Sequence, residues 1–184
     1  MVSSVKGSDN LSYQDVLRTL YEASGQNMAV IYNGVRQVLF AYLIGNNDLH
    51  CKNFSMYRNP DDATVRMRDF TPLYDVVSVA PYPEYYNDEL TLCVLSSELE
   101  AKFSPSYEVV GHYTFECFVI LATNLGIVPS AAKRLVGELC KDVAKYFKPL
   151  LAASSSPDKA VIENHIAMKL KRFSSNINLP DLSP

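Results

Sequence analysis

The chain has 184 residues and a formal net charge of −3, and 48% of its residues are hydrophobic while 20% are charged. This composition is ordinary for a globular domain, so it excludes a fibrous or intrinsically disordered chain. Basic and acidic residues are mixed along the sequence, which gives no electrostatic reason to expect direct binding to nucleic acid or to an anionic membrane.

Helical periodicity dominates the first quarter of the chain. Ser12 and Asp15 form a capping-box pattern, and the apolar residues that follow recur at helical spacing until Gly25. This pattern predicts a first helix of about 12 residues. A second apolar stripe begins at Ile31 and ends at Gly45, so we expect a well-buried helix that points directly into a polar loop.

The middle of the chain favours a small β-hairpin followed by irregular structure. Residues 53–57 and 65–70 are β-prone and are separated by a turn-rich connector, so they are expected to pair. Residues 80–106 are rich in proline and tyrosine, and they predict irregular structure around a short strand at residues 90–95.

The second half of the chain is predicted to be helical. The expected helices run from residue 106 or 107 to 125, from 129 to about 150, and from 158 to 173. The predicted organisation is a flexible lead-in at residues 1–10, one domain at 11–173 and a flexible tail at 174–184. The expected fold class is therefore mainly α, with a small hairpin.

The cysteines and the apolar runs indicate a cytoplasmic protein. Cys51, Cys93, Cys117 and Cys140 form no C-x-x-C pair, and no secretory signal opens the chain, so we expect reduced thiols. No apolar run approaches the ~18 residues that are needed to span a bilayer. We therefore expect no membrane partner.

The residues most informative about chemistry lie in the loop after the second predicted helix. Asp48 and Asn53 have the D-x-x-x-x-N spacing of a kinase catalytic loop. Phosphoryl transfer needs a carboxylate that orients the attacking hydroxyl and accepts its proton, which suits Asp48. Asn53 can offer an oxygen ligand to Mg²⁺ without adding a second full negative charge beside Asp48.

Asp75 is placed to complete such a metal site, because the predicted hairpin would return the chain to the same edge. Lys52 could bring positive charge to a transferring phosphoryl group, and His50 could fix the loop by hydrogen bonding or touch a substrate. Simpler alternatives stay open: Asp48 could be a solvated turn residue, Asn53 could satisfy backbone groups in a turn, and Lys52 could be solvated.

Two motifs occur in order along this region. The first reads G-N-x-D-x-H-x-K-N-F-S from Gly45 to Ser55, and the second reads P-x-Y-D-V-V-S from Pro72 to Ser78. Together they resemble the C-terminal, mostly helical lobe of the HipA-like serine/threonine kinases. The layout of the predicted helices is also similar over residues 12–173, although only the two motifs are specific.

The resemblance implies a helical kinase C-lobe of the HipA type, with a small hairpin beside the catalytic loop. It implies ATP- and Mg²⁺-dependent phosphorylation of serine or threonine on a protein, often by the toxin of a bacterial toxin–antitoxin pair. By position, Asp48 resembles the catalytic base, and Asn53 and Asp75 resemble the ligands of the metal and nucleotide. Lys52 and His50 are further candidates for catalysis. The implied partners are a protein substrate, an antitoxin and a separate N-terminal lobe.

The chain also departs from this family. Family members are much longer, and their N-terminal lobe supplies a phosphate-binding loop and a lysine that grips the nucleotide. Here no two of the seven glycines lie within four residues of each other, so the sequence has no glycine-rich phosphate cradle. The chain therefore resembles the catalytic half of a kinase. The alternatives are a kinase remnant that only binds a partner, and a metal-dependent hydrolase that uses Asp48 and Asp75.

Overall fold

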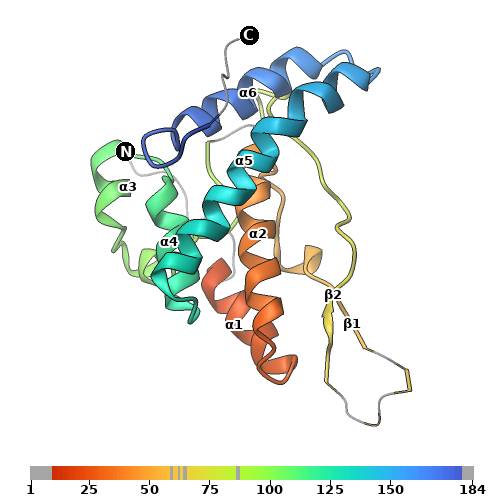
Figure 1. Ribbon diagram of the computed structural model, residues 1–184, viewed down its shortest axis with the longest axis vertical. Coiled ribbons are helices and arrows are strands. Elements are labelled where there is room, and N and C mark those ends of the chain that lie inside the picture. The colour runs from red at the N-terminus through yellow and green to blue at the C-terminus, as the bar shows by residue number, and fades with distance from the viewer. Residues whose placement is uncertain (1–9, 59, 62, 64–65, 86–87, 180–184) are drawn as a thin grey trace.

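The computed structural model describes residues 10–58, 60–61, 63, 66–85 and 88–179. These residues form a helical domain with one small antiparallel sheet at its edge (Figure 1). The α-helices are α1 (Tyr13–Ala23), α2 (Met28–Ile44), α3 (Pro105–Val110), α4 (Phe115–Asn124), α5 (Pro129–Ala153) and α6 (Lys159–Lys171). The strands are β1 (Met56–Tyr57) and β2 (Asp69–Phe70), and two 3₁₀-helices are η1 (Cys51–Asn53) and η2 (Ser96–Glu100). The predicted mainly α fold class with a small hairpin is confirmed.

Helix α2 is the centre of the domain, because it is apolar around most of its circumference and packs against α1, α4, α5 and α6. It begins at Met28, earlier than the predicted start at Ile31. The reason is that the Asn27 side-chain oxygen accepts a hydrogen bond from the Ala29 N–H at 3.0 Å and caps the helix. Gly45 ends α2 as predicted, in the left-handed conformation with φ +74°.

The first helix forms as its capping pattern predicts. The Ser12 hydroxyl accepts a hydrogen bond from the Asp15 N–H at 3.1 Å, and the Asp15 carboxylate accepts one from the Ser12 N–H at 3.0 Å. Gly34 of α2 lies directly under Leu17 of α1, so the two helices approach closely at this point. The contact fixes α1 against the helix that leads into the candidate site.

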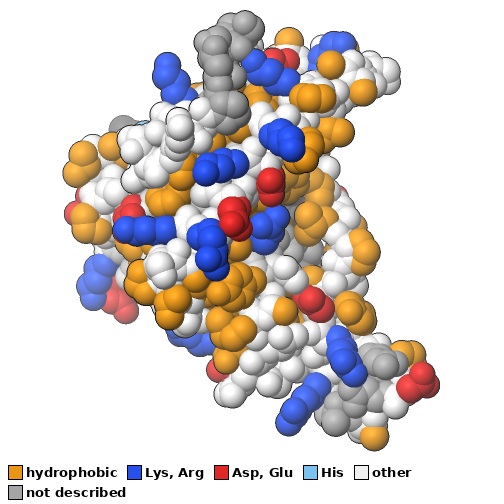
Figure 2. Space-filling model, viewed as in Figure 1, with side chains coloured by type: hydrophobic (Ala, Val, Ile, Leu, Met, Phe, Trp, Pro, Cys, Tyr) orange, Lys and Arg blue, Asp and Glu red, His pale blue; other side chains and the backbone are white. Residues whose placement is uncertain are grey.

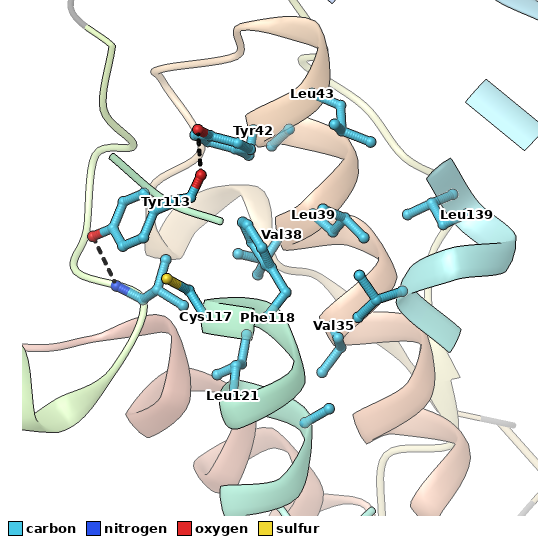
Figure 3. Close-up of a cluster of buried hydrophobic side chains, with 14 of the residues drawn as sticks. Val35, Val38, Leu39, Tyr42, Leu43, Tyr113, Cys117, Phe118, Leu121 and Leu139 are labelled. Carbon is cyan, nitrogen blue, oxygen red and sulfur yellow. Dashed lines mark hydrogen bonds between the residues drawn. The ribbon is translucent and has the colours of Figure 1, made fainter. Parts of the chain in front are cut away.

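Aromatic side chains fill the core between α2 and α4 (Figure 3). The ring centroid of Tyr42 lies 5.4 Å from that of Phe118 and 6.1 Å from that of Phe173. Because a buried tyrosine hydroxyl needs a partner, the Tyr42 hydroxyl donates a hydrogen bond to the Tyr113 carbonyl at 2.8 Å. The last turn of α2 is thereby held on the α4 side.

The predicted hairpin is present but shorter than expected. Met56 pairs with Phe70 and Tyr57 pairs with Asp69 in an antiparallel register. Asn53, predicted to begin the first strand, lies instead at the end of η1. Residue 65, the first of the second predicted segment, falls outside the described residues.

Two predicted elements are wrong. The helix expected from residue 106 or 107 to 125 is divided into α3 and α4, because Gly111 turns left-handed at φ +69° and the Thr114 N–H begins α4 by donating to the Cys117 sulfur at 3.4 Å. The strand expected at residues 90–95 is replaced, in the part of the chain that the structure describes, by one isolated parallel bridge between Ser12 and Cys93.

The chain ends lie mostly outside the described residues, so the boundaries of the lead-in and of the tail stay predictions. Ile177 and Leu179 of the expected tail pack against the core. Among the described helices, none is both long enough and apolar enough to cross a membrane. On the face that Figure 2 shows, basic and acidic side chains are interspersed.

Candidate functional site

The candidate site begins where α2 ends. After Gly45, the side chain of Asn46 is buried, and its Oδ1 accepts a hydrogen bond from the Asp48 N–H at 3.1 Å. This bond fixes the backbone of Asp48 while its carboxylate lies on the exposed side of the loop. The His50 N–H donates to the Asp48 carbonyl at 2.8 Å and leads the chain into η1.

Contacts from two distant segments hold this loop. The buried hydroxyl of Tyr13, on α1, donates a hydrogen bond to the Leu49 carbonyl at 2.6 Å. On the other side, the Thr91 hydroxyl donates to the carbonyl of Asn47. Because both hydrogen bonds are accepted by backbone carbonyls, they fix the path of the loop independently of the identity of its side chains.

The structure brings Asn53 and Asp75 into contact. The Asn53 side-chain nitrogen donates a hydrogen bond to Oδ2 of Asp75 at 3.0 Å. Asn53 is 3% exposed, and its Oδ1 is buried without a hydrogen-bond partner among the described residues. Asp75 is exposed and has an unusual backbone for a residue with a side chain, with φ +54°.

The segment that carries Asp75 is attached to the catalytic loop at both ends. The Thr71 N–H donates to the Ser55 carbonyl at 2.9 Å, and the Val79 N–H donates to the Gly45 carbonyl at 3.0 Å. The hairpin thus returns the chain to the edge of the loop, as its position in the sequence predicts.

The other two candidates lie on the same loop. Lys52 is exposed in η1, and His50 is half-buried with an Nδ1 that has no hydrogen-bond partner among the described residues. Within those residues, Asp48, His50 and Lys52 form no ion pair or side-chain hydrogen bond with Asp75. The direct contact is therefore between the two predicted metal ligands, and the predicted catalytic residues precede Asn53 on the same loop.

The side chains at this point suit an oxygen-bound cation. No cluster of three or more histidine, cysteine, aspartate or glutamate residues forms within the described residues, so they offer no zinc-type centre. One carboxylate and one amide oxygen are instead the partial set that Mg²⁺ uses when water and substrate phosphates supply its remaining ligands. The unpaired Oδ1 of Asn53 is an oxygen that such an ion would satisfy.

The model of one protein family, the HipA-like C-terminal domain, matches residues 2–147. The chain belongs to this family. The resemblance read from the two motifs is therefore confirmed, and the HipA-like domain can be compared with longer relatives.

One relative is a Haemophilus influenzae (strain Rd) protein named "Putative kinase", which is 28% identical over 186 residues. The alignment covers 96% of this chain and 50% of the relative, so the chain spans half the length of that protein. A solved structure of Shewanella oneidensis MR-1 HipA, in complex with HipB and operator DNA, superposes with a TM-score of 0.64 at 20% identity. That match covers 90% of this chain and 35% of HipA, and it supports the fold alone.

Sequence reasoning missed a partly buried charge cluster that joins Asp88 to the end of α6. Asp88 accepts hydrogen bonds from Lys169 Nζ and from Arg172 Nη1, each at 2.5 Å. Lys169 is 2% exposed, and its ammonium also lies 3.8 Å from the ring centroid of Tyr42. Burial lowers the pKa of Lys169 to about 8, although Asp88 opposes this shift. No motif marks these residues, because the partners are separated by 81 and 84 residues.

Helix α6 also touches the start of the loop. The imidazole of His165 lies so close to Gly45 that a Cβ there would be 2.7 Å from its Nε2. Burial, with the charge of Lys169, lowers the pKa of His165 to about 4, so the ring is neutral at pH 7. In the sequence, His165 lies on a predicted helix and has no acidic or cysteine partner at metal-ligand spacing, so nothing there pointed to this contact.

Proposed function

We propose that this HipA-like domain is the catalytic lobe of a protein serine/threonine kinase that uses Mg²⁺ and ATP. The observation that carries the proposal is the contact between Asn53 and Asp75, 22 residues apart in sequence, with an unpaired buried oxygen on Asn53. The family assignment supports a kinase-like class, and the Asn53–Asp75 contact supports the proposal that these two side chains bind a metal ion.

The amide of Asn53 provides a reason for this pair to take up a cation. Its nitrogen faces Asp75, while its unpaired oxygen faces no donor in the described residues. A buried unsatisfied acceptor costs about 1–3 kcal/mol. Rotation of the amide by half a turn would present Oδ1 beside the carboxylate, so that both oxygens could bind one ion. When bound, Mg²⁺ would neutralise charge on the phosphates of ATP.

Asp48 is proposed to orient the substrate hydroxyl and to accept its proton. Its carboxylate is exposed, so a serine or threonine of another protein can approach it, while its backbone is fixed by Asn46. A fixed base gains rate chiefly by holding the reacting groups in line. Lys52 and His50 are proposed to contact the transferring phosphoryl group or the substrate from the same loop.

The partners follow from the family and from the length of the chain. The chain spans half of its curated relative, so we propose that a separate lobe grips the nucleotide phosphates during catalysis. The Shewanella HipA structure contains HipB and operator DNA, which supports a toxin–antitoxin role with an antitoxin protein as partner. The proposed location is the cytoplasm, and neither a membrane nor direct nucleic-acid contact is part of the proposal.

The test is Mg²⁺-dependent binding of ATP, measured by titration calorimetry on the purified chain. We expect weak binding that requires Mg²⁺ and that disappears in Asp75→Asn. Asp142→Asn, an exposed acid of α5, is the matched control and should bind like the natural chain. Asp48→Asn should retain binding and lose phosphoryl transfer once a nucleotide-gripping lobe is supplied. Binding that ignores both Mg²⁺ and the Asp75 substitution would contradict the proposal.

A second candidate is a partner-binding module that keeps the fold without catalysis. It is favoured by the half-length match and by the scattered glycines of the chain. The same titration separates the two, because a module of this kind has no reason to bind Mg²⁺–ATP.

A further inference from the structure

The segment that carries Asp75 is not held in place by burial. Residues 72–77, which we call the strap, are exposed at every position, including the apolar Leu73, Val76 and Val77. In Figure 1 the chain after β2 follows the side of the domain rather than entering the core. Burial of apolar surface normally fixes the position of a segment, so other contacts must fix the strap.

Open space lies between this part of the chain and the helices below. A cavity of about 630 Å³ is lined by residues 71–73 together with α2 and α5, and a second cavity of about 390 Å³ reaches Ser78. The two share Phe40 and Leu139, so they meet under this region. Pro72, Leu73 and Ser78 therefore border open space at the two ends of the strap, and its polar contacts to the loop at residues 45–55 help to fix the position of Asp75.

The main polar contact comes from the hydroxyl of Tyr74. It donates a hydrogen bond to the Lys52 carbonyl at 2.6 Å and lies 2.7 Å from the Ser55 hydroxyl. A tyrosine has a single hydroxyl proton, and a carbonyl can only accept, so Ser55 must be the donor in the second bond. One hydroxyl thus joins the strap to the loop by two complementary hydrogen bonds.

The position of these bonds connects both proposed metal ligands. Lys52 and Ser55 stand on either side of Asn53, and Tyr74 directly precedes Asp75. The left-handed backbone of Asp75 is unfavourable for a residue with a Cβ, so its surroundings must maintain it. Besides the hydrogen bond that Asp75 itself accepts from Asn53, the Tyr74 hydroxyl joins the adjacent residue to the other segment.

We propose that Tyr74 is a positioning residue. Its hydroxyl clamps the strap onto the catalytic loop so that Asp75 and Asn53 can share one divalent cation. The inference deepens the proposed function and rests on it, because it concerns the geometry of the same metal site. Tyr74 itself need not touch the metal.

The experiment measures Mn²⁺ binding through paramagnetic broadening of amide NMR signals near residues 53 and 75. Tyr74→Phe keeps the ring and removes the hydroxyl, and we expect the Mn²⁺ dissociation constant to rise on the order of tenfold. The matched control is Tyr82→Phe, because Tyr82 is 46% exposed and Tyr74 is 44% exposed. The Tyr82 hydroxyl makes no hydrogen bond within the described residues, so this variant should bind Mn²⁺ normally.

Ser55 provides a second and milder test. Ser55→Ala should weaken Mn²⁺ binding, and Ser55→Thr should bind Mn²⁺ normally because it keeps a hydroxyl. The double variant Ser55→Ala with Tyr74→Phe should weaken Mn²⁺ binding by less than the product of the two single effects, because both substitutions remove the same hydrogen bond. Thermal unfolding of each variant separates clamping from general stability. Unchanged Mn²⁺ affinity in both Tyr74→Phe and Ser55→Ala, whatever their melting temperatures, would overturn the inference.

The outcome for the natural chain distinguishes this inference from the proposed function. If Mn²⁺ broadens no amide signals near residues 53 and 75 of the natural chain, the proposed metal site is wrong, and the proposed role of Tyr74 is wrong as well. If the natural chain binds Mn²⁺ and Asp75→Asn does not, the site stands, and only the response of the Tyr74 and Ser55 variants decides the clamp.

Discussion

The sharpest prediction for stability concerns Asp88, which binds Lys169 of α6 and Arg172 at the end of that helix. Its two carboxylate oxygens separately accept hydrogen bonds from Lys169 and Arg172. Asp88→Asn keeps the shape and removes the charge. The asparagine oxygen can still accept from Lys169, but its nitrogen must then face the Arg172 guanidinium, which is also a donor. The side chain of residue 88 would then offer one acceptor to two cations, and Arg172 would keep only its hydrogen bond to the Tyr42 hydroxyl at 3.2 Å among these contacts.

The magnitude follows from the burial of these groups. Removing one partner of a fully buried ion pair costs about 3–5 kcal/mol. The Lys169 side chain is 2% exposed, but that of Asp88 is 35% exposed, so water can partly replace the lost charge. We therefore expect the free energy of unfolding to fall by about 3 kcal/mol. The same substitution at Asp142, whose pair with Arg36 is exposed and 3.9 Å long, should cost less than about 1 kcal/mol.

Urea unfolding at pH 7, followed by circular dichroism, measures the free energy of unfolding of both variants. The melting temperature of Asp88→Asn should be about 6–12 °C lower than that of the natural chain. Burial would raise the pKa of Asp88, but Lys169 and Arg172 outweigh it and hold this pKa below its ordinary value of 3.8. The ion pairs therefore stabilise the fold above that pH, and the difference between natural and variant chains should shrink as pH falls below it. Equal losses in Asp88→Asn and Asp142→Asn would refute the reasoning.

Two further predictions concern the start of the loop. Gly45→Ala and Gly111→Ala should each lower the free energy of unfolding by about 1 kcal/mol, because both glycines are left-handed. Only Gly45→Ala should lower it by about 1–2 kcal/mol more, because its Cβ would meet His165. The Cβ of Gly111→Ala would meet no described atom within 4 Å. Equal losses in urea unfolding would contradict that contact. Because the pKa of His165 falls to about 4 from an ordinary 6.5, the unfolded chain takes up this proton first. The free energy of unfolding should therefore decrease by about 2 kcal/mol as the pH falls from 6.5 to 4. His165→Gln should weaken this dependence on pH. If the substitution leaves the dependence unchanged, groups other than His165 cause it.

The sequence predicted those parts of the fold whose cause is local. The Ser12 capping box, the left-handed end of α2 at Gly45 and the apolar circumference of α2 all depend on residues within a few positions of each other. The hairpin was found for the same reason. The elements that failed depend on distant or subtle partners: Cys93 pairs with Ser12, and Gly111 ends α3 within a segment that looks apolar throughout.

The candidate site was predicted as residues but not as an arrangement. The motif spacing identified Asn53 and Asp75, and the structure places them 3.0 Å apart, yet their roles stay predictions until metal binding is measured. The sequence could not show that Tyr74 bonds on both sides of Asn53, because that requires the return path of the hairpin. Nor could it show the buried Lys169, since a lysine late in an amphipathic helix normally lies in solvent.

The contacts of the loop bear on whether this HipA-like domain by itself can have a formed site. The backbone of the loop is bonded to Tyr13 on α1, to Thr91 in the middle of the chain and, through Gly45, to Val79 just after the strap. All three contacts come from this chain, so the fold of the domain is sufficient to place Asp48 and the Asn53–Asp75 pair. A separate lobe would then supply phosphate contacts to a prearranged site, and its absence should reduce nucleotide affinity far more than it disturbs the loop.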